Sequence, residues 1–250
     1  MPELPEAERA RQQIEKALGR RIVSADDADG YVCRPHGPGA IDDALRGRTL
    51  VKAHRLGKFL WVETDGDGPD LGLHLGMAGS IVVDGEPAPN SWDRFSISFE
   101  DGGRLALRDK RRLSRAVIDP DHSHIGPDAG EIDRDAFRER VGRGTAPLKA
   151  RLLDQGVLAG IGNLLADEVL WRAHLSPNRP AQSLTEEELD RLRRELRAAI
   201  RAAIRKGGVH TGDFMPARKR GRGCPRCDTE VRRATVGGRT TFWCPACQPD

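Results

Sequence analysis

The sequence predicts an α+β protein: a β-sandwich or barrel preceded by one helix, then a helical domain and a small metal-binding unit. Three observations support this prediction. Short strand-like runs broken by turn residues fill residues 20–118, apolar residues recur every three or four positions from residue 134, and four cysteines lie in the last 27 residues. We therefore expect a β-rich domain, a linker, a helical domain and a zinc finger, with the bounds 1–118, 119–133, 134–222 and 223–250.

Residues 5–19 predict an amphipathic helix at the N-terminus. Pro5 suits the first helical position and Gly19 suits the position just after the last one. The apolar positions between them follow helical spacing, namely Ala7, Ala10, Ile14, Ala17 and Leu18. The chain should therefore enter its β-rich region from a helix.

One hairpin and one linker stand out in the first half of the chain. Phe95, Ile97 and Phe99 alternate in "RFSISFE", the turn "EDGG" follows, and "RLAL" returns, which is typical of a β-hairpin. The stretch "DPDHSHIGPDAGEID" is rich in proline, histidine and aspartate and is typical of a linker.

Helical patterns follow the linker. They cover residues 134–141, 145–154, about 157–162, 164–173 and 186–206. Before the last of them, Thr185 is placed to cap the helix and Glu188 to reciprocate, which is a capping-box pattern. We therefore expect a well-defined start for a long C-terminal helix.

A glycine turn, "GIGN", lies between two of these helical segments. Gly160 and Gly162 permit a tight turn, and Asn163 is suited to cap the helix that follows. The N–H groups at such a helix start can bind an anion. With Lys149 nearby, we expect this turn to bind phosphate, although most such turns only reverse the chain.

Four of the five cysteines form a C-x2-C-x16-C-x2-C pattern: Cys224, Cys227, Cys244 and Cys247. Two such turns with a hairpin-length spacer are typical of a four-thiolate zinc site. Because four thiolates leave no open position, we expect one structural Zn²⁺ and no chemistry at the metal. A pair of disulfides is the alternative, and Cys33 is an unpaired thiol.

Basic residues concentrate at the C-terminal end. Residues 201–250 contain eleven Lys/Arg and four Asp/Glu, a net +7, whereas residues 1–200 contain thirty and thirty-four, a net −4. Between the cysteine pairs, Arg232 and Arg233 lie on one predicted strand and Arg239 follows the "GG" turn. Rigidly held guanidinium groups suit phosphates, so we expect a nucleic-acid contact here. A finger that contacts another protein is the alternative.

No segment has the pattern of a membrane span or a secretory signal. The longest apolar run is far below the about 18 residues that a span needs, and the N-terminus is acidic. We expect a cytoplasmic protein, associated with the nucleoid if it is bacterial.

Six motifs occur in a fixed order along the chain. They are "MPELPE", "LGKFL", "HLGMAGS", "DKRRLS", "LDQGVLAGIGNLLADEVLWRAHLSPNRPA" and "CPRCDTEVRRATVGGRTTFWCPAC". Together they resemble the formamidopyrimidine-DNA glycosylase/endonuclease VIII family of base-excision repair enzymes. The resemblance covers nearly the whole chain. It implies a catalytic helix on a β-sandwich, a helix–two-turn–helix domain, a zinc finger, and a monomeric DNA glycosylase with AP lyase activity on damaged double-stranded DNA.

The resemblance assigns chemistry to "MPELPE". Met1 is expected to be removed because proline follows it, which leaves Pro2 as a secondary α-amine, a class of group whose pKa lies near neutrality. This amine can attack C1′ of a damaged nucleotide, and the resulting iminium permits loss of the base and then β- and δ-elimination. Glu3 is similar to the family's acid/base, which protonates the sugar ring oxygen. Glu6 matches a glutamate that supports the site, although a favourable charge at a helix start explains it nearly as well.

The resemblance also implies phosphate contacts. Lys58 in "LGKFL" matches a lysine that holds the phosphate at the lesion, although it could be a plain surface lysine. Asn163 and Arg239 match phosphate contacts of the helical motif and of the zinc finger.

Removal of a base from a duplex requires extrusion of the nucleotide, which leaves a vacancy. Met77, Arg112 and Leu113 match the family's trio of residues that fills it. From the residues alone, Met77 would be a core methionine and "KRR" a solvated turn.

The sequence departs from the family pattern at three places. Leu113 stands where these glycosylases typically have phenylalanine, and Leu165 stands where they have tyrosine. Only residues 207–223 fill the interval that in them holds a long loop closing over 8-oxoguanine. These departures favour oxidised pyrimidines, open-ring purines or bulky adducts over 8-oxoguanine.

Two other functions stay open at this point. A non-catalytic zinc-finger DNA-binding protein on the same scaffold is opposed by the intact Pro2-Glu3 pair, since binding needs neither residue. A zinc-dependent hydrolase is opposed by the closed cysteine site. His122 and His124 in the linker are more typical of solvent-facing residues than of metal ligands.

Overall fold

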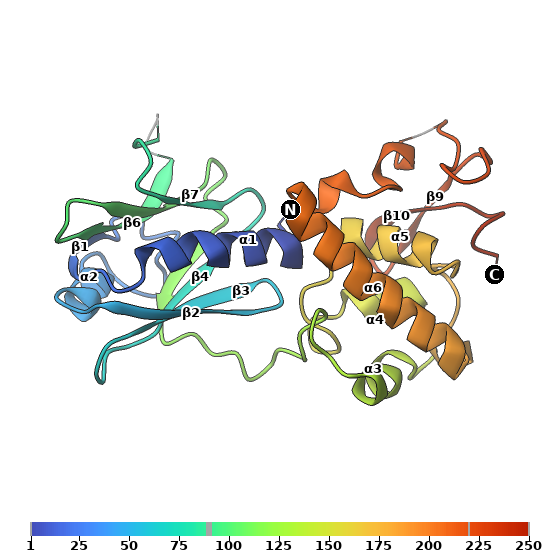
Figure 1. The fold of residues 1–250 in the computed structure, drawn as a ribbon, viewed down its shortest axis with the longest axis horizontal. Helices are drawn as coiled ribbons and strands as arrows, with labels where there is room; N and C mark the ends of the chain where they lie inside the picture. The colour runs from blue at the N-terminus through green and yellow to red at the C-terminus, as the bar shows by residue number, and fades with distance from the viewer. Residues whose placement is uncertain (1, 89–91, 220, 250) are drawn as a thin grey trace. The chain divides into compact units, whose positions relative to one another are not determined.

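The computed structural model describes residues 2–88, 92–219 and 221–249, and Met1, whose removal the sequence predicts, lies outside them. The chain forms two compact units, each with its own apolar core (Figure 1). Unit 1 comprises residues 1–2 and 7–123, and unit 2 comprises Glu3–Glu6 and residues 124–250. The first residues of the N-terminal helix therefore pack with unit 2, although the sequence places them in the β-rich domain.

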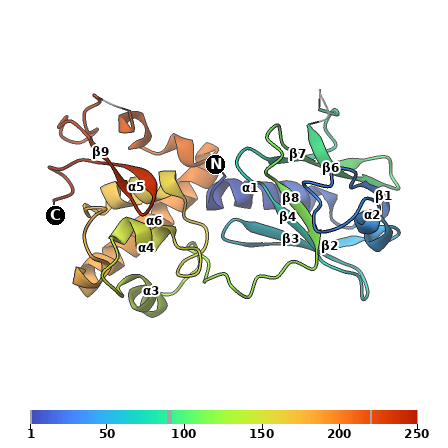
Figure 2. The same cartoon turned by 180° about the vertical axis from the view of Figure 1, so that it is seen from behind.

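Unit 1 contains two four-stranded antiparallel sheets. One has the order β1-β6-β7-β5, and the other has the order β2-β3-β4-β8, which can be followed in Figure 2. The strands are β1 (Ile22–Asp26), β2 (Leu50–Leu56), β3 (Phe59–Thr64), β4 (Leu71–His74), β5 (Ser80–Val83), β6 (Asp93–Phe99), β7 (Arg104–Arg108) and β8 (Arg115–Ile118). Leu60 and Val62 on β3 share one buried core with Phe95 and Ile97 on β6. The predicted β-sandwich is confirmed, and the predicted hairpin is β6–β7.

Two helices accompany these sheets. α1 (Leu4–Ile14) continues as one 3-10 turn over Glu15–Ala17 and ends before Gly19, whose φ of +77° suits glycine. α2 (Ala40–Leu45) has no counterpart among the predicted elements. It begins where the buried Asp27 carboxylate accepts backbone N–H groups, which replaces the local cap that the sequence lacks.

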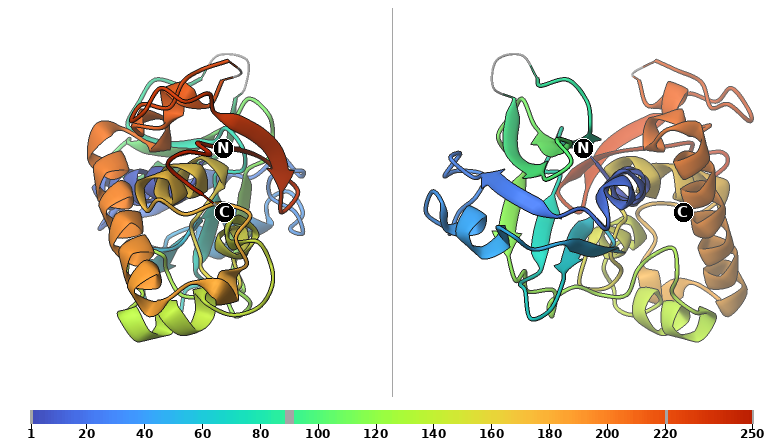
Figure 3. Two further views of the ribbon diagram at one scale, coloured as in Figure 1. Left: turned by 90° about the vertical axis from the view of Figure 1, so that its right-hand side faces the viewer. Right: turned by 60° about the vertical axis from the view of Figure 1, so that its left-hand side comes forward.

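Unit 2 is helical, as predicted. Its helices are α3 (Arg134–Val141), α4 (Leu148–Leu153), α5 (Asn163–Arg172) and α6 (Glu186–Lys206), with short 3-10 turns at Ala181–Ser183, Val209–Thr211 and Met215–Ala217. At the start of α6, the long orange helix in Figure 3, Thr185 and Glu188 exchange the two hydrogen bonds of the predicted capping box. None of the helices in the described ranges has both the length and the apolar character needed to cross a membrane.

The chain between α4 and α5 differs from the prediction. Residues 157–162 form turns rather than a helix, because the chain reverses direction at Gly160, which has a φ of +108°. Gly162 occupies the capping position and supplies no side-chain bond, and Asn163 is the first helical residue. The predicted asparagine cap is therefore wrong.

The predicted hairpin between the cysteine pairs is present. It consists of β9 (Arg232–Val236) and β10 (Arg239–Trp243), joined by two glycines with φ of +57° and +71°. Trp171 and Phe214 pack in a small apolar cluster with Cys224 and Cys244. This cluster joins the finger to the helical part of unit 2.

Candidate functional site

The carboxylate of Glu3 lies buried at the start of α5. Its Oε2 accepts the N–H groups of Gly162 (2.9 Å) and Leu165 (3.0 Å), and its Oε1 accepts that of Leu164 (2.8 Å). A helix start offers unpaired N–H groups and partial positive charge, which suit a carboxylate. A Cβ at Gly162 would lie 2.3 Å from the Glu3 side chain, so the close approach requires glycine. The anion that these N–H groups bind is therefore the protein's own Glu3, and the prediction that they bind phosphate is wrong.

Glu6 fixes the same stretch of chain. One of its carboxylate oxygens accepts the N–H of Glu3 at 2.9 Å, and the other accepts the N–H of Val209 at 2.7 Å. Gly208 has a φ of +141°, and a Cβ there would lie 2.5 Å from the Glu6 carboxylate. Pro2 is half-buried and is joined directly to Glu3. The residue at the expected mature N-terminus thus stands next to a residue that is held by its backbone and by its side chain.

Lys149 does not reach the surface. Its side chain is fully buried, and its Nζ lies 2.6 Å from Asp167 Oδ1 and 2.8 Å from the Thr241 hydroxyl. Burial lowers the pKa of the Lys149 ammonium, while the Asp167 charge acts against that shift. Arg218 Nε donates to the other Asp167 oxygen at 2.8 Å. A direct phosphate contact by Lys149 is therefore wrong, because protein acceptors enclose its ammonium group.

Asn163 and Arg239, the other predicted phosphate contacts of this half, lie on adjoining elements of unit 2. Nδ2 of Asn163 donates to the carbonyl of Thr240, the residue after Arg239, at 3.0 Å. An asparagine amide has two N–H groups, so this bond leaves the second one for a ligand. Arg239 is exposed at the start of β10, and Arg232 and Arg233 are exposed on β9.

Lys58 lies in the tight turn between β2 and β3, where Gly57 has a φ of +61°. His74, which is not among the predicted site residues, ends β4 and pairs with Phe59 across the sheet. Burial lowers the pKa of His74, and the charge of Lys58 adds to that effect. Its Nδ1 accepts the N–H of Gly76 at 3.1 Å, so the neutral ring carries its hydrogen on Nε2. An ammonium and a neutral N–H donor thus lie near one another at one end of β3.

Two loops carry the predicted intercalating trio. Gly76, in the first loop, lies so close to Leu113, in the second, that a Cβ would come within 2.4 Å of the Leu113 backbone. The two loops therefore touch. Met77 is 40% exposed, which excludes a place in the core. The second loop is shaped by buried Asp109, whose Oδ2 accepts the Leu113 N–H at 2.7 Å.

Arg112 is an ordered cation. Its Nε and Nη2 donate to the two Asp29 oxygens at 2.9 and 2.7 Å, and its backbone φ is +55°. Burial acts to raise the pKa of Asp29, but the Arg112 bond and backbone N–H groups lower it overall. The Arg112 guanidinium also lies 5.9 Å from the centre of the Tyr31 ring. These contacts hold the half-exposed Arg112 side chain in one orientation, which a freely solvated turn would not do.

The four cysteines of the finger converge on one point. Their sulfur atoms all lie within 4.8 Å of one another, as ligands of one tetrahedral ion do. All four are free thiols, which excludes the disulfide alternative. The indole N–H of Trp171 donates to Cys224 Sγ at 3.3 Å, a contact that orients a ligand from outside the set. The residues fit one structural Zn²⁺ with no open coordination position.

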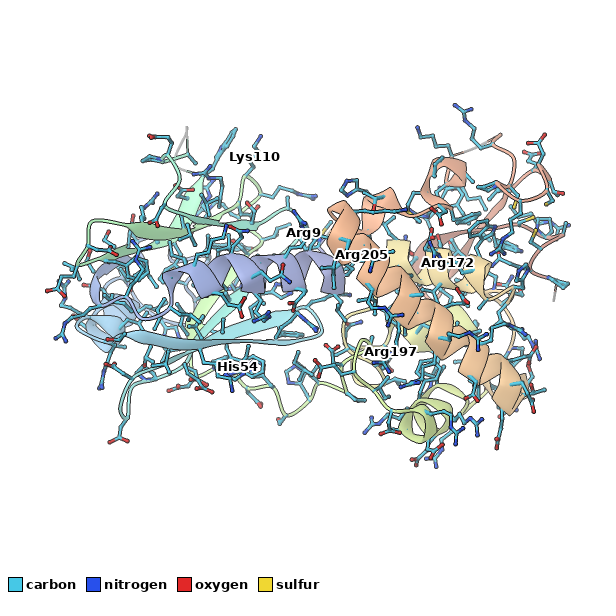
Figure 4. The ribbon with its side chains drawn as sticks, in the orientation of Figure 1. Arg9, His54, Lys110, Arg172, Arg197 and Arg205 are labelled. Atoms are coloured by element: carbon cyan, nitrogen blue, oxygen red, sulfur yellow. The ribbon has the colours of Figure 1, made fainter. Side chains whose placement is uncertain are left out.

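The segment after α6 is tied to α5. Glu168 on α5 accepts the N–H groups of Asp213 (3.1 Å) and Phe214 (2.8 Å). Arg172, labelled in Figure 4, pairs with Glu168 at 2.6 Å and with Asp213 at 2.7 Å. Phe214 is fully buried, with its ring 5.5 Å from that of Trp171. The shortened interval 207–223 is therefore fastened to the helix at its middle.

The acidic residues that organise these contacts are missing from the predicted site: Asp29, Asp109, Asp167 and Glu168. Asp109 could have been found, because an aspartate followed at two to five positions by turn residues is a typical acceptor of their N–H groups. Asp167 and Glu168 interrupt an apolar helix, which is a signal for buried partners. Nothing in the local sequence marks Asp29 as the partner of Arg112.

Comparisons with known families cover nearly the whole chain. The N-terminal domain of formamidopyrimidine-DNA glycosylase matches residues 1–116, and the H2TH domain of the same enzyme matches residues 125–214. A zinc finger found in FPG and IleRS matches residues 224–249. These matches follow the order of the sandwich, the helical region and the four-cysteine finger.

Named relatives and solved structures agree with these matches. A formamidopyrimidine-DNA glycosylase of a Nocardioides species is 35% identical over all of this chain and 95% of its own length, and one of Thermus thermophilus is 36% identical over 99% and 98%. A Lactococcus lactis Fpg bound to abasic-site DNA has a TM-score of 0.85 and 30% identity, covering 99% of this chain and 100% of that one. A MutM bound to DNA with carbocyclic 8-oxo-G has a TM-score of 0.86 and 31% identity, covering 100% of both chains. The chain therefore belongs to the formamidopyrimidine-DNA glycosylase family of base-excision repair enzymes, which are DNA glycosylases with AP lyase activity.

Proposed function

We propose that this chain removes damaged bases from double-stranded DNA with Pro2 as the nucleophile and Glu3 as the acid/base. The observation that carries the proposal is the Glu3 carboxylate, fixed by three N–H groups at the start of α5 with Pro2 joined to it. Catalysis by a terminal amine requires a terminus that is held in place, because a reacting atom must lie within about 3–3.5 Å of its target. Glu6 supports this role by accepting the Glu3 N–H.

Pro2 and Glu3 supply the groups for loss of the base and opening of the sugar ring. The lone pair of the unprotonated Pro2 nitrogen forms a bond to C1′ while the glycosidic bond breaks and its electron pair leaves with the base. Glu3 takes the proton from that nitrogen and delivers it to O4′ as the C1′–O4′ bond breaks and the iminium forms. Loss of a C2′ proton expels the 3′ phosphate, and a second elimination expels the 5′ phosphate. Water then hydrolyses the iminium and restores the amine.

Borohydride trapping tests the nucleophile. We expect the protein with a free Pro2 amine to form a covalent complex with abasic-site duplex DNA in the presence of borohydride. A short N-terminal extension converts the Pro2 nitrogen to an amide and should abolish the complex, whereas the same extension at the C-terminus should not. Trapping by the N-terminally extended protein would show that another amine is the nucleophile.

We propose that four side chains hold the DNA backbone at the lesion: Lys58, His74, Asn163 and Arg239. Lys58 directly precedes Phe59, the cross-strand partner of His74, and Asn163 adjoins the strand that begins with Arg239. Cationic and N–H donors of this kind bind phosphate oxygens. Alanine at any one of them should weaken binding to every duplex alike, and Lys58→Ala and Arg239→Ala, which each remove a cation, should also lower the salt dependence of binding.

Met77, Arg112 and Leu113 are proposed to fill the vacancy left by the extruded nucleotide. The contact between their loops and the exposure of Met77 support this role. Met77→Ala should slow excision from a duplex but not cleavage of an abasic site in single-stranded DNA, where no vacancy exists.

For lesion choice, we propose that formamidopyrimidines and oxidised pyrimidines are better substrates than 8-oxoguanine. The supporting observation is the segment 207–223, which is fastened to α5 through Glu168 and through the buried Phe214. A segment whose N–H groups are already bonded has little to offer to an extruded base. Cleavage rates on matched duplexes that differ only in the lesion test this proposal, and equal rates for 8-oxoguanine would contradict it.

The enzyme is further proposed to act as a monomer in the compartment that holds the chromosome. One chain supplies the acid/base, the metal-binding finger and the proposed phosphate contacts. Light scattering with and without a short duplex tests the first point.

A further inference from the structure

The buried ammonium of Lys149 makes contacts that bear on DNA binding, although it cannot touch DNA itself. Lys149 is the second residue of α4, and Asp167 pairs with it from α5 at 2.6 Å. Its remaining hydrogen bonds go to strand β10 of the finger. Nζ donates to the Thr241 hydroxyl at 2.8 Å and to the Thr240 carbonyl at 3.3 Å.

These bonds fix the backbone at Arg239. The Thr241 hydroxyl, which accepts from Lys149, donates in turn to the carbonyl of Arg239 at 3.0 Å. The carbonyl of Thr240 belongs to the next peptide group. Lys149 therefore holds two consecutive peptide groups directly after the arginine, one directly and one through a hydroxyl.

The contact between Lys149 and β10 also includes Asn163. Its Nδ2 and the Lys149 ammonium share one acceptor, the Thr240 carbonyl, at 3.0 and 3.3 Å. On the hairpin turn, a Cβ at Gly237 would lie 2.8 Å from Ala150, which follows Lys149 in α4. The bonds of Lys149 and Asn163 to this shared carbonyl thus set the spacing between Asn163 and the start of β10.

The use of a charged pair, Lys149 and Asp167, where α4 and α5 meet β10 supports a positioning role. A buried ion pair is rarely more stable than an apolar pair of the same size, because both charges lose their hydration. What the ammonium adds is connectivity, since its three N–H groups can donate to three acceptors at once, here Asp167, Thr241 and Thr240. Asp167 keeps that ammonium in place and also accepts from Arg218 at 2.8 Å.

We propose that Lys149 is a positioning residue for DNA binding, which sets Arg239 and Asn163 at the spacing needed to hold one backbone phosphate. This inference rests on the proposed phosphate contacts of these two residues. It predicts that the effect of Arg239 on DNA binding depends on Lys149, whereas a residue that merely stabilises the fold would act independently of Arg239.

A double-mutant cycle with the full-length, zinc-loaded protein tests the proposal. The variants are Lys149→Met, Arg239→Ala and their combination, and the probe is a duplex with a tetrahydrofuran abasic analogue. We expect each single variant to weaken binding about tenfold and the combination to weaken it about tenfold to twentyfold. A combined loss of about a hundredfold, the product of two independent effects, would overturn the proposal.

Two further variants distinguish a positioning effect of Lys149 from a loss of the fold in Lys149→Met. Thr241→Val removes one acceptor of Lys149 with little change in size and leaves the pair with Asp167 intact, so it should show the same coupling to Arg239. Arg226→Gln is the matched control, because Arg226 ties the same finger to α5 by donating to the Trp171 carbonyl at 2.6 Å without touching β10. Its effect should multiply with that of Arg239→Ala, and equal coupling in the control would overturn the proposal.

These measurements distinguish the phosphate contacts of Arg239 and Asn163 from the positioning role of Lys149. If Arg239→Ala and Asn163→Ala leave binding unchanged, the proposed phosphate contacts fail. If they weaken binding but the cycle with Lys149 shows independent effects, only the positioning role fails. Zinc content measured on each variant shows whether the finger is still folded.

Discussion

The three N–H groups around Glu3 predict that this residue stabilises unit 2 as well as acting in catalysis. The perturbation is Glu3→Gln, which keeps the size of the side chain and removes the charge. In its better orientation, the glutamine oxygen faces the N–H groups of Gly162 and Leu165, and its amide NH2 then faces the N–H of Leu164. Donor meets donor at that position, so one bond is lost and two become neutral.

The expected cost follows from the geometry. A hydrogen bond to a charged group contributes about 1.5–3 kcal/mol, and a neutral one contributes about 1 kcal/mol. Losing one charged bond, at about 1.5–3 kcal/mol, and weakening two others, at about 0.5–2 kcal/mol each, therefore costs about 2.5–7 kcal/mol. We expect Glu3→Gln to lower the free energy of unfolding of unit 2 by about 4 kcal/mol.

Urea unfolding, with zinc release from the finger as the readout for unit 2, measures this cost. Glu139→Gln is the matched control, since Glu139 lies in α3 of unit 2 with its side chain 60% exposed and should cost less than about 1 kcal/mol. If the two variants unfold at the same urea concentration, the Glu3 carboxylate is not a structural cap and the reasoning is refuted. Without urea both variants remain folded, so a loss of activity by Glu3→Gln under that condition reports the effect on chemistry alone.

Three other outcomes are expected. Burial acts to raise the pKa of Asp93, but hydrogen bonds from Arg108, the Ala88 N–H and Arg104 lower it to about 2, below its ordinary value of 3.8. Its charge should therefore add about 2 kcal/mol at neutral pH that disappears as pH falls through this range, so Asp93→Asn should destabilise unit 1 at pH 7 and have no effect near pH 2 in urea unfolding. Cys33 is fully buried, which raises the pKa of its thiol to about 12, so iodoacetamide should label it only in urea; labelling of the native protein, located by mass spectrometry, would contradict this. Chelation of zinc should abolish DNA binding in a gel-shift assay and leave the urea midpoint of unit 1 unchanged, because the finger belongs to unit 2.

The parts of the fold that the sequence predicts correctly are those with local causes. The capping box at Thr185, the hairpin turn after Phe99 and the paired cysteines each depend on residues within a few positions of one another, or on a spacing that one ion explains. The errors concern partners that are distant in sequence. Glu3 caps a helix 159 positions away, and Lys149 finds its hydroxyl acceptor 92 positions away. A helix start and a lysine look like a phosphate site until those partners are known.

The polar residues of α5 show how one short helix organises most of unit 2. Its start receives the Glu3 carboxylate, and its first residue, Asn163, donates to the finger strand. One turn later, Asp167 binds Lys149, and Glu168 binds the N–H groups of the segment after α6. Asn163 and Asp167, four positions apart, lie on the same side of the helix and both reach the contact with Lys149 and β10, whereas Glu168, one position further, is rotated by about 100° and reaches the segment after α6. A change in the register of α5 would therefore displace the acid/base, the finger and the segment together, which explains why a mostly buried helix carries three polar residues that an apolar core alone would not need.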